Sequence, residues 1–265
     1  MIGIFFNFAN MRIGEISELA GIYQRLSKGV IDHDKYTYYS ITHHSTAIEG
    51  STLTEKQTVN LLEYGRTAGN KPIEHHLMVL DYYKALDFVI RAGRELKPVT
   101  VQFIQAIASK VKMHTGETVN TILGSYETDK GDFRLSGVRA GNRLFPDYKK
   151  VPEMVRQLCD STNVEIKKVM TFEEKTNLAF KLHYDFVSIH PFGDGNGRTS
   201  RLLMNFIQSG FNLPLSIVFK QDRMKYINAL ENARNGEDIT LFYKFMYDQY
   251  AKFLKKEIAI LREKE

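Results

Sequence analysis

Apolar residues recur at helical spacing along most of the chain. Four long segments carry an apolar residue at every third or fourth position: 73–93, 100–111, 171–190 and 239–264. In the third segment the apolar residues that fall together are Leu178, Leu182, Phe186 and Ile189. Residues spaced in this way share one face of an α-helix. The pattern therefore predicts a largely helical protein.

The boundaries of the helix in 171–190 are marked in the sequence. Thr171 and Glu174 are spaced as a capping box, in which each side chain satisfies a free backbone amide of the other residue. His190 precedes a proline, and that position is disfavoured for helical geometry, so we expect the helix to end there. Helical spacing resumes in residues 198–210 and stops at a glycine, which is a common helix terminator.

Residues 131–147 are an exception to the helical pattern. Phe133 and Val138 flank a glycine, and Gly141 followed by Asn142 offers a two-residue hairpin turn. We therefore predict an all-α fold with one small β-hairpin. Because a lone two-stranded ribbon is only marginally stable, this hairpin needs a packing partner or a functional role.

Charge and composition narrow the classes of function. The 265 residues include 43% hydrophobic residues, as in a globular protein. Lys and Arg total 36 and Asp and Glu total 31, which gives a net charge of +5. This small excess is spread along the chain, whereas a nucleic-acid-binding protein usually gathers it in a patch or stripe. We therefore expect no specific nucleic-acid binding.

Cysteine content and hydropathy indicate the compartment. The single cysteine, Cys159, cannot form an internal disulfide, which suits a reducing environment, and we expect it to be a buried apolar side chain. No uninterrupted apolar run reaches the length of about 18 residues that a membrane-spanning helix needs. We expect a cytoplasmic protein that makes no membrane contact.

The loop between the two helices has the composition of a phosphate site. Residues 188–201 read SIHPFGDGNGRTSR, and glycines such as Gly195 and Gly197 let backbone amides approach a ligand closely. The loop leads into a helix N-terminus, where free amides and the helix dipole favour an anion. Arg198 and Arg201, three residues apart, can hold phosphate oxygens.

Two further residues of the loop suggest chemistry. Asp194 suits Mg²⁺, which takes one or two protein carboxylates while substrate phosphates complete its coordination. His190 can accept a proton from an attacking hydroxyl group. A metal site made of His183, His190 and Asp194 is an alternative, although no further ligands fall at suitable spacing.

Residues 190–201, HPFGDGNGRTSR, resemble the signature H-x-F-x-[DE]-G-N-G-R-x-x-R of the Fic domain family. All the fixed positions match: His190, Phe192, Asp194, Gly195, Asn196, Gly197, Arg198 and Arg201. The hairpin sequence GDFRLSGVRAG is similar to the flap of this family. The resemblance implies an all-α Fic-type domain with one small β-hairpin flap and an N-terminal helical extension. We divide the chain into an N-terminal helical region with an inhibitory motif, a Fic core domain and a C-terminal helix: 1–70, 71–240 and 241–265.

The resemblance implies a protein adenylyltransferase, which transfers AMP from ATP to a hydroxyl side chain of a target protein. His190 would be the general base, Asp194 would hold Mg²⁺, and Phe192 would anchor the loop from beneath. Residues implied to contact the nucleotide lie in the loop, in the first helical turn and in a later helix: Gly195, Asn196, Gly197, Arg198, Thr199, Ser200, Arg201 and Tyr226.

The partner implied by the resemblance is a protein that presents a Tyr, Thr or Ser hydroxyl on an extended segment. This segment would pair with the flap as an added strand, and the flap residues assigned to it are Val138, Arg139, Ala140 and Gly141. The chain itself is a second candidate target, and a homodimer is a candidate assembly.

An upstream segment, HHSTAIEGSTLT, contains a candidate regulatory motif. Ser45 and Glu49 are four residues apart, on one helical face, and Gly50 ends that helix. A carboxylate at a helix C-terminus opposes the helix dipole, so Glu49 should have a cationic partner. The segment resembles the inhibitory motif [ST]-x-x-x-[ED]-[GN] of many Fic proteins. We therefore predict that Glu49 pairs with Arg201 and prevents productive binding of ATP.

Alternative functions remain open at this stage. Tyr226 is a suitable contact for adenine, but Ile227 and Arg234 occupy two positions where polar or aromatic contacts to the base are expected from the resemblance. Transfer of UMP, GMP or phosphocholine is therefore an alternative. The same site could also remove AMP from a modified protein, with Glu49 orienting water. A catalytically silent binding module is the last alternative.

Overall fold

The structure is a computed structural model of the chain, and it describes residues 2–140 and 143–263. The described residues form ten α-helices: α1 (Ile2–Ser27), α2 (His33–Ile48), α3 (Glu55–Tyr64), α4 (Ile73–Arg94), α5 (Val101–Val111), α6 (Val151–Ile166), α7 (Phe172–Ile189), α8 (Asn196–Gly210), α9 (Arg223–Asn235) and α10 (Thr240–Arg262). The helices predicted from apolar spacing are all present. The capping box at Thr171 and Glu174 forms as predicted and starts α7.

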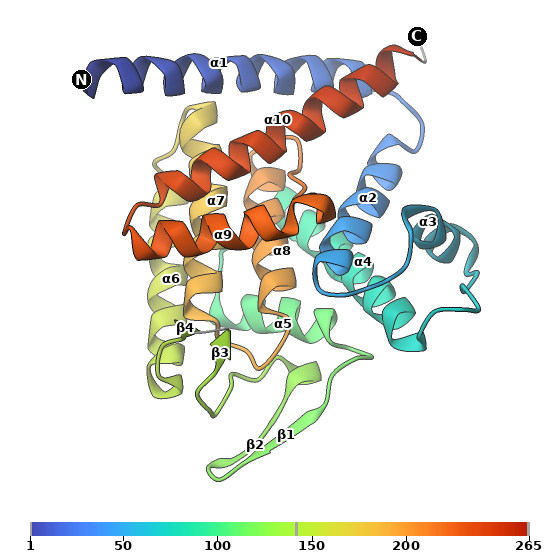
Figure 1. Cartoon of the computed structure of the whole chain (residues 1–265), viewed down its shortest axis with the longest axis vertical. Coiled ribbons are helices and arrows are strands. Elements are labelled where there is room, and N and C mark those ends of the chain that lie inside the picture. The colour runs from blue at the N-terminus through green and yellow to red at the C-terminus, as the bar shows by residue number, and fades with distance from the viewer. Residues whose placement is uncertain (1, 141–142, 264–265) are drawn as a thin grey trace.

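Helix α8 lies at the centre of the fold. It packs against α7, α4, α5 and α2, and its residues from Arg198 to Gln208 are all buried. Helices α7 and α8 run side by side, and the loop that joins them lies at their lower end in Figure 1. This arrangement places the N-terminus of α8, where the motif arginines lie, in the interior of the protein.

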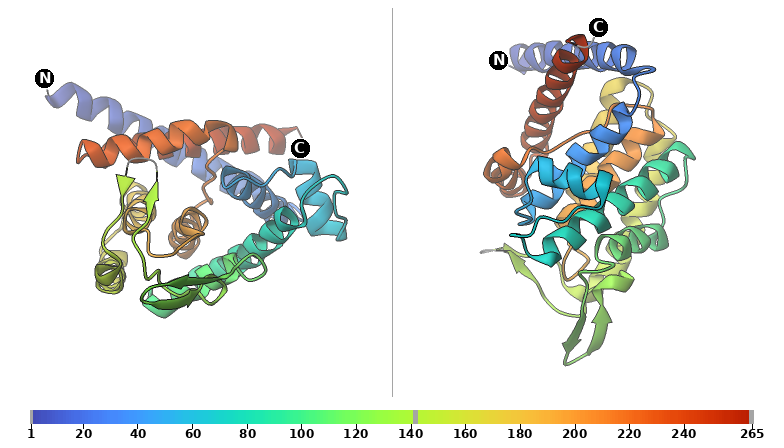
Figure 2. Two further views of the ribbon diagram at one scale, coloured as in Figure 1. Left: turned by 60° about the horizontal axis from the view of Figure 1, so that its bottom comes forward. Right: turned by 90° about the vertical axis from the view of Figure 1, so that its right-hand side faces the viewer.

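One hydrophobic core joins the terminal helices to the rest. Helix α1 packs along α10, at the end of the molecule opposite the hairpins (Figure 2). The same buried cluster contains Ile16 of α1, Leu203 of α8 and Leu261 of α10. The three segments into which we divide the sequence therefore share a core. No helix within the described residues combines the length and hydropathy that crossing a membrane requires.

Two small antiparallel hairpins lie beside the α7–α8 loop (Figure 1). Strands β3 (Arg139–Ala140) and β4 (Arg143–Leu144) form the hairpin that the sequence predicts, with Arg139 opposite Leu144. The predicted turn at 141–142 lies outside the described residues. Strands β1 (Thr118–Thr121) and β2 (Gly124–Glu127) form a second hairpin that the sequence analysis did not predict.

Candidate active site

The loop between α7 and α8 is held in shape by its own backbone and by one side chain. His190 ends α7 in the left-handed region, with φ of 54°, and its amide donates to the carbonyl of Phe186 over 3.0 Å. The side-chain amide of Asn196 closes the loop, because its oxygen accepts from the amide of Phe192 over 3.0 Å and its nitrogen donates to the carbonyl of the same residue over 2.8 Å. The resemblance implied a phosphate contact for Asn196, but this side chain is engaged within the loop.

Two apolar contacts support the loop from below. The Phe192 ring is buried between Phe186 and Phe133, with ring centroids 6.1 and 5.6 Å away. Tyr126 of the unpredicted β1–β2 hairpin lies against Gly193. A Cβ atom at Gly193 would lie 2.6 Å from the Tyr126 hydroxyl oxygen, so a larger residue here would displace the tyrosine ring. The second hairpin therefore helps to fix the loop.

The His190 imidazole is enclosed and uncharged. Its ring stacks on Phe145 with centroids 3.9 Å apart and planes at 20°. Burial lowers the pKa of His190 to about 4. The imidazole is therefore neutral near pH 7 and can accept a proton.

Arg134 fastens the flap to the loop, a function that the sequence analysis missed. Its side chain is 1% exposed, and its Nε donates to the carbonyl of His190 over 2.8 Å. Its other two nitrogens donate to the carbonyls of Ser136 and Pro146, over 2.7 and 2.6 Å. The three bonds link the backbone at His190 to both ends of the β3–β4 hairpin.

Asp194 is ionised and surrounded by donors. Its Oδ1 accepts from the amide of Gly195 over 2.6 Å, and its Oδ2 accepts from Lys112 over 2.6 Å and from Arg198 over 2.9 Å. Burial opposes the charge of Asp194, but Arg198 and Lys112 outweigh it and lower the pKa of Asp194 to about 2. A single ionised carboxylate with a half-exposed side chain fits Mg²⁺ that is completed by phosphate oxygens and water.

The alternative metal site is not assembled. No cluster of three or more His, Cys, Asp or Glu residues that could hold a metal ion occurs in the part of the chain that the structure describes. The Nε2 of His183 pairs with the Tyr226 hydroxyl over 2.7 Å. His183, His190 and Asp194 therefore do not form a shared metal site.

The two motif arginines keep unused donors at the N-terminus of α8. Gly195 begins this helix without any side-chain cap. Arg198 Nε and Nη1 and Arg201 Nη1 are buried and have no hydrogen-bond partner among the described residues. Buried donors are nearly always satisfied, so these atoms favour an anionic ligand.

Glu49 pairs with Arg201, as predicted from the sequence, and Ser45 also contacts this arginine. Arg201 Nη2 donates to Glu49 Oε1 over 2.7 Å and to the Ser45 carbonyl over 3.0 Å, and its Nε donates to Ser45 Oγ over 2.7 Å. Burial disfavours the charged guanidinium, but Glu49 outweighs this effect and raises the pKa of Arg201. A Cβ atom at Gly197 would lie 2.4 Å from Glu49 Oε1, so the carboxylate rests directly on the loop.

The remaining predicted site residues lie in the first turn of α8, on the flap and on α9. Thr199 and Ser200 are buried in the first turn of α8, where Ser200 Oγ donates to the Gly197 carbonyl. Val138 and Arg139 lie on the flap with Ala140, whereas Gly141 lies outside the described residues.

The predicted residues on α9 include two that contact α7. Tyr226 is buried, and its hydroxyl is hydrogen-bonded to His183. Little of its surface is therefore exposed for contact with an adenine ring. Arg234 Nε donates to Ser188 Oγ over 3.1 Å, and Ile227 is half-buried. Burial lowers the pKa of Arg234 to about 10.

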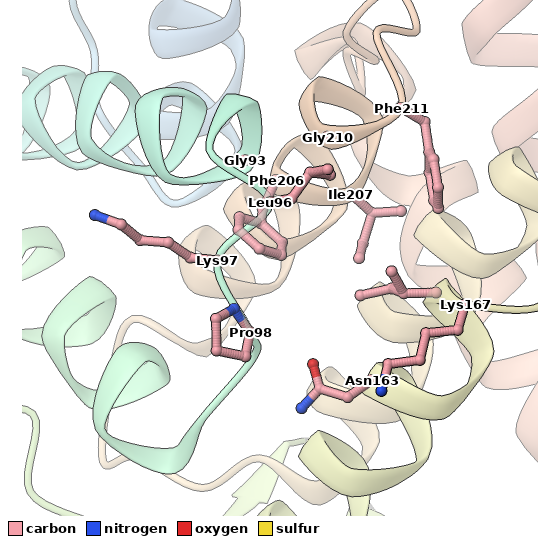
Figure 3. A pocket seen from close by; sticks show the side chains of 11 residues that line it. Gly93, Leu96, Lys97, Pro98, Asn163, Lys167, Phe206, Ile207, Gly210 and Phe211 are labelled. Atoms are coloured by element: carbon pink, nitrogen blue, oxygen red, sulfur yellow. The ribbon is translucent and has the colours of Figure 1, made fainter.

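A separate cavity lies at the opposite end of α8. Its volume is about 260 Å³, and apolar side chains such as Phe206, Ile207 and Phe211 line it, with Lys97 and Lys167 at the edge (Figure 3). None of the predicted site residues lines this cavity.

Comparison with known proteins gives consistent matches. A model described as the Fic/DOC family matches residues 98–208. The chain is similar to proteins named Protein adenylyltransferase Fic: it is 33% identical to the one from Drosophila willistoni over 220 residues, which cover 83% of this chain and 41% of that protein. It is 32% identical to the one from Drosophila melanogaster, over 83% of this chain and 42% of that protein. The chain thus spans about two fifths of the length of these relatives.

Solved structures share the fold. A Fic domain containing signaling protein from Bacteroides thetaiotaomicron aligns with a TM-score of 0.80 at 22% identity, covering 94% of this chain and 97% of that one. Residues 134–508 of Fic-1 from C. elegans align with a TM-score of 0.79 at 23% identity, covering 100% of this chain and 76% of that one.

Proposed function

Residues 98–208 form a domain of the Fic/DOC family, and on this premise we propose that the chain is a protein adenylyltransferase that moves AMP from ATP to a hydroxyl side chain of a target protein. The observation that carries the proposal is the set of unsatisfied buried donors on Arg198 and Arg201 beside a neutral His190. Such donors suit a polyphosphate, and such an imidazole suits proton removal from a hydroxyl. The names of the relatives point to the same activity.

The residues divide the reaction between them. The free amides at the start of α8, with Arg198 and Arg201, would bind the phosphates. Asp194 would hold Mg²⁺, which supplies charge neutralisation on the phosphate oxygens. The target hydroxyl oxygen would bond to the α-phosphorus as the bond to the bridging β-phosphate oxygen breaks. His190 would take the hydroxyl proton, and pyrophosphate would leave with the bonding electrons.

The flap would present the target. Strand β3 is only two residues long, and Arg139 on it is exposed. An extended target segment would add to this strand through main-chain hydrogen bonds. Because Arg134 ties both ends of the flap to the backbone of His190, a segment bound there would have its hydroxyl close to the base.

Glu49 would restrain this activity. Arg201 cannot give the same Nη2 donor to Glu49 and to a γ-phosphate. The Glu49 carboxylate also rests on Gly197, where a bound phosphate would approach the loop. The protein would therefore bind ATP weakly or in a poorly reactive position until Glu49 moves away.

Labelled ATP tests the proposal directly. The full chain is incubated with α-labelled ATP, Mg²⁺ and a cell lysate, and label on protein is measured. We expect His190→Ala to reduce labelling by about 10²- to 10⁴-fold, the usual effect of losing a general base. Binding of ATP, followed by calorimetry, should persist in this variant because the phosphate site is intact.

The same assay separates the alternatives. Unchanged labelling by His190→Ala would contradict the assignment of the base. Loss of label from a pre-modified target, without gain, would mark a hydrolase. Labelling by UTP, GTP or a choline-containing donor in preference to ATP would change the transferred group.

A further inference from the structure

Lys112 is a buried cation inside the proposed site. It follows α5 directly, its side chain is 10% exposed, and its Nζ lies 2.6 Å from Asp194 Oδ2. Lysine side chains are rarely so enclosed unless they are paired. The ammonium group of Lys112 therefore occupies the carboxylate that we assign to Mg²⁺.

The backbone and the stem of Lys112 are firmly held. The buried Asp81 carboxylate accepts from the His114 amide over 2.8 Å and from the His114 ring over 2.6 Å, which fixes the turn after α5 to α4. The methylene groups of Lys112 pack under the loop: a Cβ atom at Gly195 would lie 3.6 Å from Lys112 Cγ and 3.8 Å from its Cδ. Only the end of the side chain is free to change its partner.

Both oxygens of the Asp194 carboxylate are already occupied by donors, so a metal ion cannot bind without displacing one of them. Asp194 Oδ2 already accepts from both Lys112 and Arg198, while Oδ1 accepts from the Gly195 amide. Mg²⁺ binds a carboxylate oxygen at about 2.0–2.1 Å, which would leave the ammonium group within a few ångströms of a divalent charge. The repulsion between the Lys112 ammonium group and the metal ion must displace one of them.

We propose that Lys112 competes with the divalent cation for Asp194 and transfers its ammonium group to a nucleotide phosphate when the nucleotide binds. This inference rests on the proposed function, because it takes Asp194 as the metal ligand. Without nucleotide, Lys112 neutralises the carboxylate and lowers its affinity for a metal. With nucleotide, Lys112 gains a phosphate oxygen as its new partner and releases the carboxylate. Metal and nucleotide therefore bind cooperatively, and Lys112 provides the link.

Binding of Mn²⁺ to the nucleotide-free full chain tests the competition. Mn²⁺ stands in for Mg²⁺ and is followed by electron paramagnetic resonance. If Lys112 holds Oδ2 about nine tenths of the time, Lys112→Met should bind Mn²⁺ about tenfold more tightly than the natural sequence, because the apparent affinity scales with the free fraction of the site. Methionine keeps the packed stem and removes the charge. Damage to the site would weaken Mn²⁺ binding, so a gain in affinity is specific to the competition.

Three further variants complete the series. Lys112→Arg keeps a cation and should remain as weak as the natural sequence. Lys110→Met is the matched control, since its ammonium lies 4.8 Å from the centre of the Phe88 ring and does not contact Asp194, and its affinity should be unchanged. Asp194→Asn should abolish the binding. Circular dichroism melts establish that each variant is folded.

A second measurement tests the transfer to phosphate. ATP affinity is measured by calorimetry with EDTA present, and Lys112→Met should bind ATP several-fold more weakly than Lys110→Met, because one of the cations that hold the phosphates is gone. Equal ATP affinities would overturn this half of the proposal.

The outcomes separate this inference from the proposed function. Equal Mn²⁺ affinity in the natural sequence and Lys112→Met, with loss in Asp194→Asn, would overturn the competition and leave Asp194 as the metal ligand. Mn²⁺ binding that persists in Asp194→Asn would overturn both the competition and the metal assignment. Labelling of protein by ATP would still stand or fall on the His190→Ala experiment alone.

Discussion

The two sides of the first turn of α8 present the same chemistry with different connections. On the loop side, Arg198 pairs with Asp194, four residues earlier, at 2.9 Å. On the α2 side, Arg201 pairs with Glu49, 152 residues earlier, at 2.7 Å. Both arginines are buried, but the Asp194 side chain is 55% exposed and that of Glu49 is 30% exposed.

The first pair is local to the site, whereas the second depends on the position of a distant helix. Asp194 in the loop and Arg198 in the first turn of α8 are four residues apart, so their pairing is a local contact within one segment. Glu49 reaches Arg201 only because α2 packs against α4 and α8. Loss of Asp194 should therefore disable the proposed enzyme, whereas loss of Glu49 should release it.

The largest effect is expected on the loop side. Asp194→Asn removes the proposed metal ligand and leaves Lys112 and Arg198 without a counter-charge. We expect label transfer from ATP to fall by about 10²- to 10³-fold, the order found when one electrostatic stabiliser is removed from an active site. Asp185→Asn, which removes an α7 carboxylate paired with Lys181, is the control and should keep its activity. Activity of Asp194→Asn close to that of the control would refute the difference between the sides.

The α2 side should respond in the opposite direction. A charge-assisted hydrogen bond contributes about 1.5–3 kcal/mol, so Glu49→Gly should raise labelling at saturating ATP by about ten- to a hundredfold. Adding Arg201→Ala to this variant should reverse the gain, because a phosphate contact is then lost.

Glu63→Gly is the control for the gain. It removes a carboxylate that pairs with Lys35 at 2.6 Å, away from the site, and should leave labelling unchanged. A rate for Glu49→Gly no higher than that of Glu63→Gly would show that α2 exerts no restraint.

Acid should lower the free energy of unfolding, in part through two histidines of α2. Burial lowers the pKa of His43 to about 4 and that of His44 to about 3, so both are neutral in the folded protein at pH 5. The unfolded chain binds these protons near pH 6.5, and so the free energy of unfolding falls as the pH drops below that value. Between pH 7 and 5 each histidine accounts for roughly 2 kcal/mol of the loss.

Urea unfolding at pH 7 and at pH 5 measures how much these histidines contribute to the loss of stability. The buried His183 and the half-buried His190 also have lowered pKa values and act in the same direction, so the comparison is between variants. His44→Gln should lose less stability between pH 7 and 5 than the natural sequence does. Asp194 stays ionised throughout because its pKa is about 2. An equal loss in both proteins would place the acid sensitivity elsewhere.

The smallest effect should come from Ser45. Ser45→Ala removes the hydroxyl that accepts from Arg201 Nε, but the Ser45 carbonyl and Glu49 still hold Nη2. One hydrogen bond worth about 1 kcal/mol should raise labelling about fivefold. Ser40→Ala on the same helix, where the hydroxyl lies 3.4 Å from Glu55, is the control and should give the unmodified rate. A gain equal to that of Glu49→Gly would show that the carboxylate has no special role.

Local signals in the sequence were sufficient to predict where the loop begins and that helices flank it. The capping box at Thr171 and the proline after His190 act within a few residues, and both ends of α7 lie where these signals place them. Local chemistry also indicated that Glu49, an acid at a helix C-terminus, needs a cationic partner. The choice of Arg201, 152 residues away, came from the resemblance to the inhibitory motif.

Features that depend on distant contacts were missed. Lys112 lies 82 positions from Asp194 and Arg134 lies 56 positions from His190, and nothing in their neighbourhoods marks them as different from other basic residues. The β1–β2 hairpin has a polar sequence, and Tyr126 is its buried contact with the loop. The Asn196 amide turned inward because the backbone at Phe192 required a donor and an acceptor.

The order in which the chain is synthesised gives the Glu49 contact a further consequence. Helix α2 leaves the ribosome well before α8, since domains emerge from the N-terminus at about 5–20 residues per second. Glu49 is thus already present when Arg201 first enters the core. Each newly made molecule would fold directly into the restrained form, without an intervening active state that could label proteins at random during translation. Activity would then require a later event that separates Glu49 from Arg201, and a newly synthesised molecule would be inactive until that event.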